Sequence, residues 1–151
     1  MKIMKNLILA FAILAFTSVR AQILEPVTWS TSVIKISDTE YDLVATASID
    51  THWHLYSQNV PEDGPIATSF TFKGNGSYLK KGNTTEETGK TIDDPVFGMK
   101  IKFFEKKANF KQRIKLKGKT PLKIDATVEF MVCDDSRCLP PTEVELVFNV
   151  K

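Results

Sequence analysis

The sequence predicts an all-β protein, an antiparallel β-sandwich of immunoglobulin-like plan that forms a single domain. Three observations lead to this prediction. Short runs alternate apolar with polar residues, as strands with one buried face do. Glycine, proline and asparagine separate these runs, and no long segment keeps a helical period. Many short strands at this spacing are typical of sandwiches.

The N-terminal residues 1–21 have the composition of a secretory signal peptide. Lys2 and Lys5 precede an apolar run, and Val19 and Ala21 place small side chains where a signal peptidase cleaves. The apolar run is about ten residues long, whereas a membrane-spanning helix needs roughly 20. We therefore expect a domain of residues 22–151 with no membrane anchor, in the periplasm or another extracytoplasmic compartment of the envelope.

The charge of the expected domain is close to neutral. The whole chain has 20 basic and 18 acidic residues. Lys2, Lys5 and Arg20 leave with the signal peptide, so 17 basic residues remain against 18 acidic ones. This balance gives no electrostatic basis for binding nucleic acid or an anionic membrane.

The candidate strands follow one another along the chain. Residues 29–36, 41–49 and 52–57 form three β-rich runs, and shorter candidates lie at 69–72, 77–81, 101–105 and 108–116. The polar stretches 60–65 and 82–95 contain glycine, proline or asparagine and are expected to be loops.

The third run carries most of the aromatic and imidazole side chains of interest. Alternation puts Trp53 and Leu55 on one face, with Trp53 in the core. His52, His54 and Tyr56 then share the other face.

The two most regular alternations come last and predict a hairpin. Facing their apolar sets pairs Val128 with Val144, whereas Cys133 faces Cys138 only after a one-residue shift. Pro140-Pro141 lies in the interval and cannot donate ladder hydrogen bonds, so a β-bulge is expected there.

Cys133 and Cys138 are the only cysteines, and they flank a four-residue loop. Facing residues of a hairpin have Cα atoms about 4.5 to 5.5 Å apart, within the range that a disulfide spans. A structural staple across so short a loop would contribute only about 2 kcal/mol. An exposed bridge is more often labile, so a redox-active pair and a structural staple are both open interpretations.

The charges in the loop distinguish the two thiols. Asp134 and Asp135 disfavour a thiolate at Cys133, whereas Arg137 favours one at Cys138. Cys138 is therefore the expected point of contact with a partner, and Cys133 the expected resolving residue.

Metal binding is the remaining alternative for these residues. Two cysteines supply half of a zinc site. Copper could use His52 and His54 together with the thiols and the thioether of Met131, because imidazole and soft sulfur ligands suit that metal. Our interpretation requires neither metal nor cofactor.

The cysteine hairpin also carries a resemblance to a known family. Residues 132–143, in which the cysteine pair is followed by Leu-Pro-Pro, resemble the N-terminal periplasmic domain of the thiol–disulfide interchange protein DsbD. Residues 53–56 resemble an aromatic strand segment that lies beside the cysteines in that family, and residues 94–98 resemble its cap loop. The likeness extends more faintly over most of residues 22–151.

The resemblance implies an immunoglobulin-like fold and a redox role. Members of that family take electrons from a membrane partner through a thioredoxin-like domain and reduce disulfides in periplasmic isomerases and cytochrome-maturation proteins. Their second cysteine joins the partner, which agrees with the charge argument for Cys138. The resemblance also suggests a set of residues that line the site: Tyr56, His54, Asp94, Val96, Phe97 and Arg137.

The sequence departs from the family pattern in several places. The cysteines are one residue closer together than in the best-known member. The cap aromatic falls on Val96 when the loop is aligned on Gly98, with Phe97 one place later, so either residue could cover the disulfide. Asp94 matches an acidic residue near the thiols, but Pro95 replaces the acidic neighbour.

These observations together predict an envelope module that passes electrons between redox partners through Cys133 and Cys138. The expected activity is thiol:disulfide interchange of the protein-disulfide reductase type. The expected partners are thioredoxin-like proteins and a separate membrane electron donor, because no thioredoxin-like domain follows up to Lys151. The alternative is a non-catalytic, protein-binding sandwich with a structural hairpin disulfide.

Overall fold

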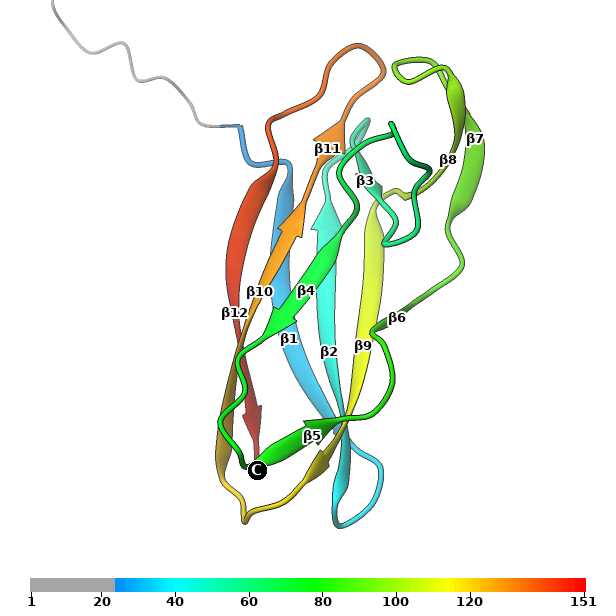
Figure 1. The fold of residues 1–151 in the computed structure, drawn as a ribbon. Helices are drawn as coiled ribbons and strands as arrows, with labels where there is room; N and C mark the ends of the chain where they lie inside the picture. The colour runs from blue at the N-terminus through cyan, green and yellow to red at the C-terminus, as the bar shows by residue number, and fades with distance from the viewer. Residues whose placement is uncertain (1–23) are drawn as a thin grey trace, which may run out of the picture.

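A computed structural model describes residues 24–151, so the expected signal peptide lies outside the described residues. Every helix or strand element described in residues 24–151 is a β-strand. All the strand pairs are antiparallel. The prediction of an all-β, antiparallel sandwich of immunoglobulin-like plan is confirmed (Figure 1). No helix that could cross a bilayer is present in this part of the chain.

The described strands form three sheets. The first contains, in spatial order, β1 (Val27–Lys35), β2 (Glu40–Ile49), β9 (Lys107–Leu116) and β5 (Tyr78–Lys80), with β6 (Thr85–Glu86) also paired to β9. The second contains β12 (Thr142–Val150), β10 (Leu122–Phe130) and β4 (Ser69–Phe72). The third contains β11 (Val132–Cys133), β3 (His54–Tyr56), β8 (Met99–Phe104) and β7 (Lys90–Asp94).

The first two sheets pack face to face around an aromatic core. The ring of Trp29 on β1 lies 5.8 Å from that of Phe110 on β9, 5.9 Å from that of Phe70 on β4 and 5.5 Å from that of Phe130 on β10. Strands β9 and β10 bury every second side chain, as expected of strands with one solvated face. The apolar alternation seen in the sequence therefore correctly identifies the core-facing residues of these two strands.

The third sheet is an extension of the sandwich at one end. Strand β10 continues into β11 after the single residue Met131, and β8 continues into β9 after Glu105 and Lys106. Lys106 has a φ of 63°, and its carbonyl accepts a 2.8 Å bond from the amide of Ile49 at the end of β2. The hairpin tip that follows β11 and the turn between β7 and β8 lie at this same end (Figure 1).

The hairpin register agrees with the sequence prediction. Val128 faces Val144, and that register holds as far as Phe130, which faces Thr142. Cys133 nevertheless faces Cys138. The one-residue shift therefore falls at Pro140-Pro141, as predicted.

Residues 82–95 were expected to be a loop, and this expectation is wrong. They contain β6 and β7, and β7 pairs with β8 along its whole length. In β7 the residues from Lys90 to Asp93 are exposed on both faces, and only Asp94 is buried. An edge strand with two polar faces has no apolar alternation, so periodicity could not identify it.

The third run of the sequence is also shorter as a strand than expected. It begins at His54, because His52 lies in a turn with a φ of 71°. His52 and His54 therefore do not share a strand face. Trp53 is buried in the core, as expected.

A buried carboxylate, that of Glu86, fixes the segment between β5 and β7. Its Oε1 accepts hydrogen bonds from Ser57 Oγ at 2.5 Å and from Lys102 Nζ at 2.8 Å, and its Oε2 accepts one from the Gln58 amide at 2.8 Å. Burial raises the pKa of Glu86. The bonds from Lys102, Ser57 and Gln58 outweigh burial and hold the pKa below its usual range.

We expect the Glu86→Gln variant to be roughly 1–3 kcal/mol less stable at neutral pH, because its partners lose a charged acceptor. The pKa of Glu86 is lower in the folded than in the unfolded chain. Its contribution is therefore complete above about pH 4.5 and is lost as the pH falls through the folded value. Urea unfolding at several pH values measures this effect. Below about pH 4.5 the native protein should lose stability more steeply than the variant, and equal slopes would contradict the prediction.

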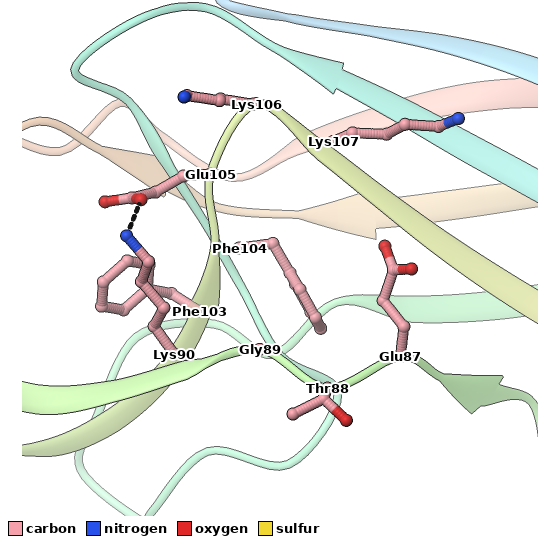
Figure 2. A pocket seen from close by; sticks show the side chains of 9 residues that line it. All are labelled: Glu87, Thr88, Gly89, Lys90, Phe103, Phe104, Glu105, Lys106 and Lys107. Atoms are coloured by element: carbon pink, nitrogen blue, oxygen red, sulfur yellow. Dashed lines mark hydrogen bonds and ion pairs between the residues drawn. The ribbon is translucent and has the colours of Figure 1, made fainter.

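Gly89 allows the chain to enter β7 very close to β8. A Cβ at this position would lie 2.6 Å from the Phe103 carbonyl oxygen and 3.0 Å from Phe104 Cε1. Figure 2 shows Gly89 against these two residues, at the edge of a cavity of about 300 Å³. A side chain here would push β7 away from β8.

The Gly89→Ala variant is expected to be destabilised by roughly 1–3 kcal/mol, the usual effect of forcing atoms into a packed site. Gly74→Ala is the matched control, because a Cβ there meets nothing within 4 Å. Chemical denaturation of both variants measures the difference. Equal stabilities would show that β7 can move away from β8 at no cost.

Candidate functional site

The hairpin tip beyond β11 brings the two cysteines into a disulfide. Cys133 and Cys138 are bonded, and their Cα atoms are 4.0 Å apart, somewhat closer than expected. The Asp134 amide donates to the Arg137 carbonyl at 2.9 Å, and the Leu139 amide donates to the Val132 carbonyl at 3.0 Å. These backbone bonds lie on either side of the cysteine pair.

Asp134 holds the four-residue turn between the cysteines. Its Oδ1 accepts bonds from the Ser136 amide, the Ser136 hydroxyl and the Arg137 amide, each at 2.9 Å. Together with the Arg137 side chain, these bonds, the Ser136 amide foremost, lower the pKa of Asp134 to about 2. The turn is thus organised by local bonds within residues 134–137.

The two sulfur-bearing residues differ in burial. Cys133 is 1% exposed and belongs to a small apolar cluster with Tyr56, Ile101 and Phe103. Cys138 packs against that cluster but is only partly buried. Of the two cysteines, Cys138 is therefore the more accessible.

Arg137 lies beside Cys138 but is not an unopposed charge. Its guanidinium lies over the Trp53 ring at 5.8 Å, and its Nε is 3.2 Å from Asp134 Oδ2. The distinction between the two thiols consequently rests more on burial than on the charge of Arg137.

Tyr56 and Asp94 connect the cluster to the turn between β7 and β8. Tyr56 is fully buried, and its hydroxyl donates to Asp94 Oδ2 at 3.0 Å. Burial, followed by the charge of Asp94 and this hydrogen bond, raises the pKa of Tyr56, so the hydroxyl stays protonated. Asp94 Oδ1 accepts the amides of Val96 at 2.9 Å and Phe97 at 3.1 Å.

These bonds determine which residue of the turn faces the disulfide cluster. Phe97 packs against the cluster, with its ring edge-on to Tyr56 at 5.9 Å. Val96 is 43% exposed. Of the two candidates left open by the sequence, Phe97 is therefore the one that contacts the cluster around Cys133.

His54 lies on the same face of the third sheet as Cys133. It is the cross-strand partner of Cys133, and its ring is 4.5 Å from that of Phe103. Its Nε2 is 3.5 Å from Oε1 of Glu105. Glu105 and Phe103 were not singled out in the sequence, because they reach the site only through the pairing of β3 with β8.

The arrangement gives the copper alternative no support. His52 and His54 do not share a strand face, and no group of three or more His, Cys, Asp or Glu side chains in residues 24–151 is arranged to hold a metal ion. What the described side chains do form is a disulfide with one partly exposed cysteine, beside an apolar cluster against which Phe97 packs. That arrangement suits thiol–disulfide exchange.

A family model matches almost the whole described chain. The model is described as "Thiol:disulfide interchange protein DsbD, N-terminal", and it matches residues 20–149. A comparison with curated proteins finds no match.

Solved structures of low sequence identity share the fold. The reduced DsbD N-terminal domain of Neisseria meningitidis has 13% identity and a TM-score of 0.55, covering 88% of this chain and 94% of that one. The N-terminal periplasmic domain of ScsB from Proteus mirabilis has 13% identity and a TM-score of 0.56, covering 83% of this chain and 48% of that one. The DsbD N-terminal domain in its complex with the PilB N-terminal domain, from N. meningitidis, has 10% identity and a TM-score of 0.52, covering 85% and 88%.

Proposed function

The chain belongs to the family of N-terminal domains of the thiol:disulfide interchange protein DsbD, and from this premise we propose that it is a thiol–disulfide exchange module of the cell envelope. It passes electrons between redox proteins through Cys133 and Cys138. The observation that carries the proposal is the disulfide between these residues at one end of the sandwich, with Cys138 partly exposed. The step needs no cofactor.

The unequal burial of the two cysteines supports different roles for them. In the reduced domain the Cys138 thiolate attacks a disulfide of the oxidised partner, which releases one partner thiolate and forms a mixed disulfide. The Cys133 thiolate then attacks Cys138 Sγ, which restores the internal disulfide and releases the second partner thiolate. The partner gains two electrons and the domain loses two.

The turn at residues 95–98 shields the disulfide between encounters. Phe97 covers the cluster from one side, and Asp94 ties the turn to Tyr56. An approaching partner displaces the ring of Phe97 and reaches Cys138. This role agrees with the cap loop that residues 94–98 resemble.

Membership of the family supports our proposal for the partners and the location. The solved complex of a DsbD N-terminal domain with a PilB N-terminal domain supports a protein partner here. We place thioredoxin-like proteins in that role, with a separate membrane protein as the electron donor. Residues 22–151 form the domain, and it acts in the periplasm after residues 1–21 are removed.

Electron transfer from a thioredoxin-like protein tests the proposal directly. The oxidised domain is mixed with reduced thioredoxin in native buffer, and free thiols are counted by alkylation and mass spectrometry. We expect reduction of Cys133–Cys138 while the circular dichroism of the fold is unchanged. Thioredoxin with alkylated thiols is the control. A bond that is reduced only in denaturant would instead support the structural staple.

A further inference from the structure

The burial of Cys133 creates a difficulty for the second half of the exchange. Cys133 must be a thiolate when it attacks Cys138 Sγ. It is 1% exposed and lies among Tyr56, Ile101 and Phe103, and such burial disfavours the charged form. A proton acceptor within reach of Cys133 would therefore favour this step.

His54 is in position to do so. Cys133 and His54 face each other across the antiparallel pair of β11 and β3, and such partners have Cβ atoms about 4.5–5.5 Å apart. The imidazole lies against the ring of Phe103, a member of the cluster that contains Cys133. The imidazole is thus a direct cross-strand neighbour of the Cys133 side chain.

Glu105 orients the imidazole from the other side. Its Oε1 lies 3.5 Å from His54 Nε2, while Lys90 Nζ is paired with its Oε2. Figure 2 shows Lys90 reaching from β7 toward the Glu105 carboxylate. The bond from Lys90 lowers the pKa of Glu105 against the opposing effect of burial, so this carboxylate stays ionised. Cys133, His54 and Glu105 thus correspond to the nucleophile, the base and the orienting carboxylate of other sites that activate a nucleophile.

The other titratable groups nearby are less suited to accept this proton. Both carboxylate oxygens of Asp94 are already occupied by hydrogen bonds from Tyr56 and the 95–98 turn. The hydroxyl of Tyr56 stays protonated. Other titratable side chains, those of Asp50, His52, Lys106 and Asp135, line a solvent-open cavity of about 290 Å³ beside His54 and Glu105. This cavity lets a proton on His54 pass to solvent.

We propose that His54 accepts the proton of the Cys133 thiol when Cys133 resolves the mixed disulfide, with Glu105 as the positioning residue. The proton moves to the imidazole, the sulfur–sulfur bond between Cys133 and Cys138 forms, and the bond from Cys138 to the partner breaks with the partner leaving as a thiolate. In the reverse direction the imidazolium returns the proton to Cys133. This inference rests on the proposed function.

Oxidised glutathione separates the two steps of the reaction. The reduced domain is mixed with it between about pH 5 and 8, the range over which histidine side chains titrate. Acid quenching and mass spectrometry then follow the glutathione adduct on Cys138 as it forms and decays. In His54→Gln we expect adduct formation at the native rate and adduct decay slowed tenfold or more at about pH 6.5, without the native pH inflection.

Two further variants make the test decisive. His52→Gln, which lies in the same cavity but is not paired with Cys133, should decay as the native protein does. Glu105→Gln should slow decay in the same sense but less, and it decides the question if His54→Gln does not fold. Native decay and pH profile in the folded variants would overturn this inference alone. If the native protein forms neither the adduct nor the internal disulfide, the proposed function is overturned and this inference with it.

Discussion

The Cys133→Ser variant is expected to capture a redox partner and to hold it. Without the resolving sulfur, Cys138 can attack a partner disulfide but the mixed disulfide has no internal route to release. Mixing the reduced variant with an oxidised thioredoxin-like protein should therefore yield a covalent complex that survives non-reducing electrophoresis. We expect nearly all of the variant to be trapped when the partner is in excess.

The Cys138→Ser variant is the matched control for this capture. Its remaining cysteine, Cys133, is 1% exposed and lies within the cluster. It should trap little or no partner and should lose essentially all exchange activity. Capture through Cys133 alone would reverse the assignment of roles, and capture by neither variant would contradict exchange at this site.

Replacement of Asp94 by alanine is expected to have the largest effect outside the cysteines. The carboxylate of Asp94 is the acceptor for the buried Tyr56 hydroxyl and for two amides of the 95–98 turn. A buried hydroxyl left without an acceptor costs roughly 1–3 kcal/mol, and the loosened turn no longer holds Phe97 against the cluster. We expect lower stability in urea and reduction of the disulfide by dithiothreitol at a several-fold higher rate.

Asp93→Ala provides the control for this prediction. Asp93 is the preceding residue of β7, and its carboxylate pairs with Lys100 on the surface, at 3.2 Å. Such exposed pairs contribute about 0–1 kcal/mol, so little change is expected. Adding Tyr56→Phe to Asp94→Ala should recover part of the lost stability, because no unsatisfied hydroxyl remains. Equal behaviour of the Asp93 and Asp94 variants would contradict a role for Asp94 in holding the turn.

The parts of the fold that sequence alone could predict are those with regular alternation. The register of β10 against β12, and its shift at Pro140-Pro141, followed from matching apolar residues and from the missing proline amides. Strand β7 escaped prediction because it is exposed on both faces and is held by its pairing with β8. No local pattern marks an edge strand of that kind.

The candidate site, like the fold, could be predicted from the sequence only in part. The cysteine pair was evident from its spacing, but the choice between Val96 and Phe97 depends on how Asp94 folds the turn. An aspartate two and three residues before the amides that it binds is a local turn signal, and it could have indicated the turn. Glu105 had no such signal, since only the pairing of β3 with β8 brings it to His54.

The reduction potential of Cys133–Cys138 tests the central claim most directly. The folded domain is equilibrated with dithiothreitol or glutathione redox buffers, and the fraction of free thiols is measured by alkylation. A redox module predicts a potential above about −300 mV, reached while the fold stays intact. A potential below that value, or thiols that appear only as the domain unfolds, would mean that the bond is a structural staple.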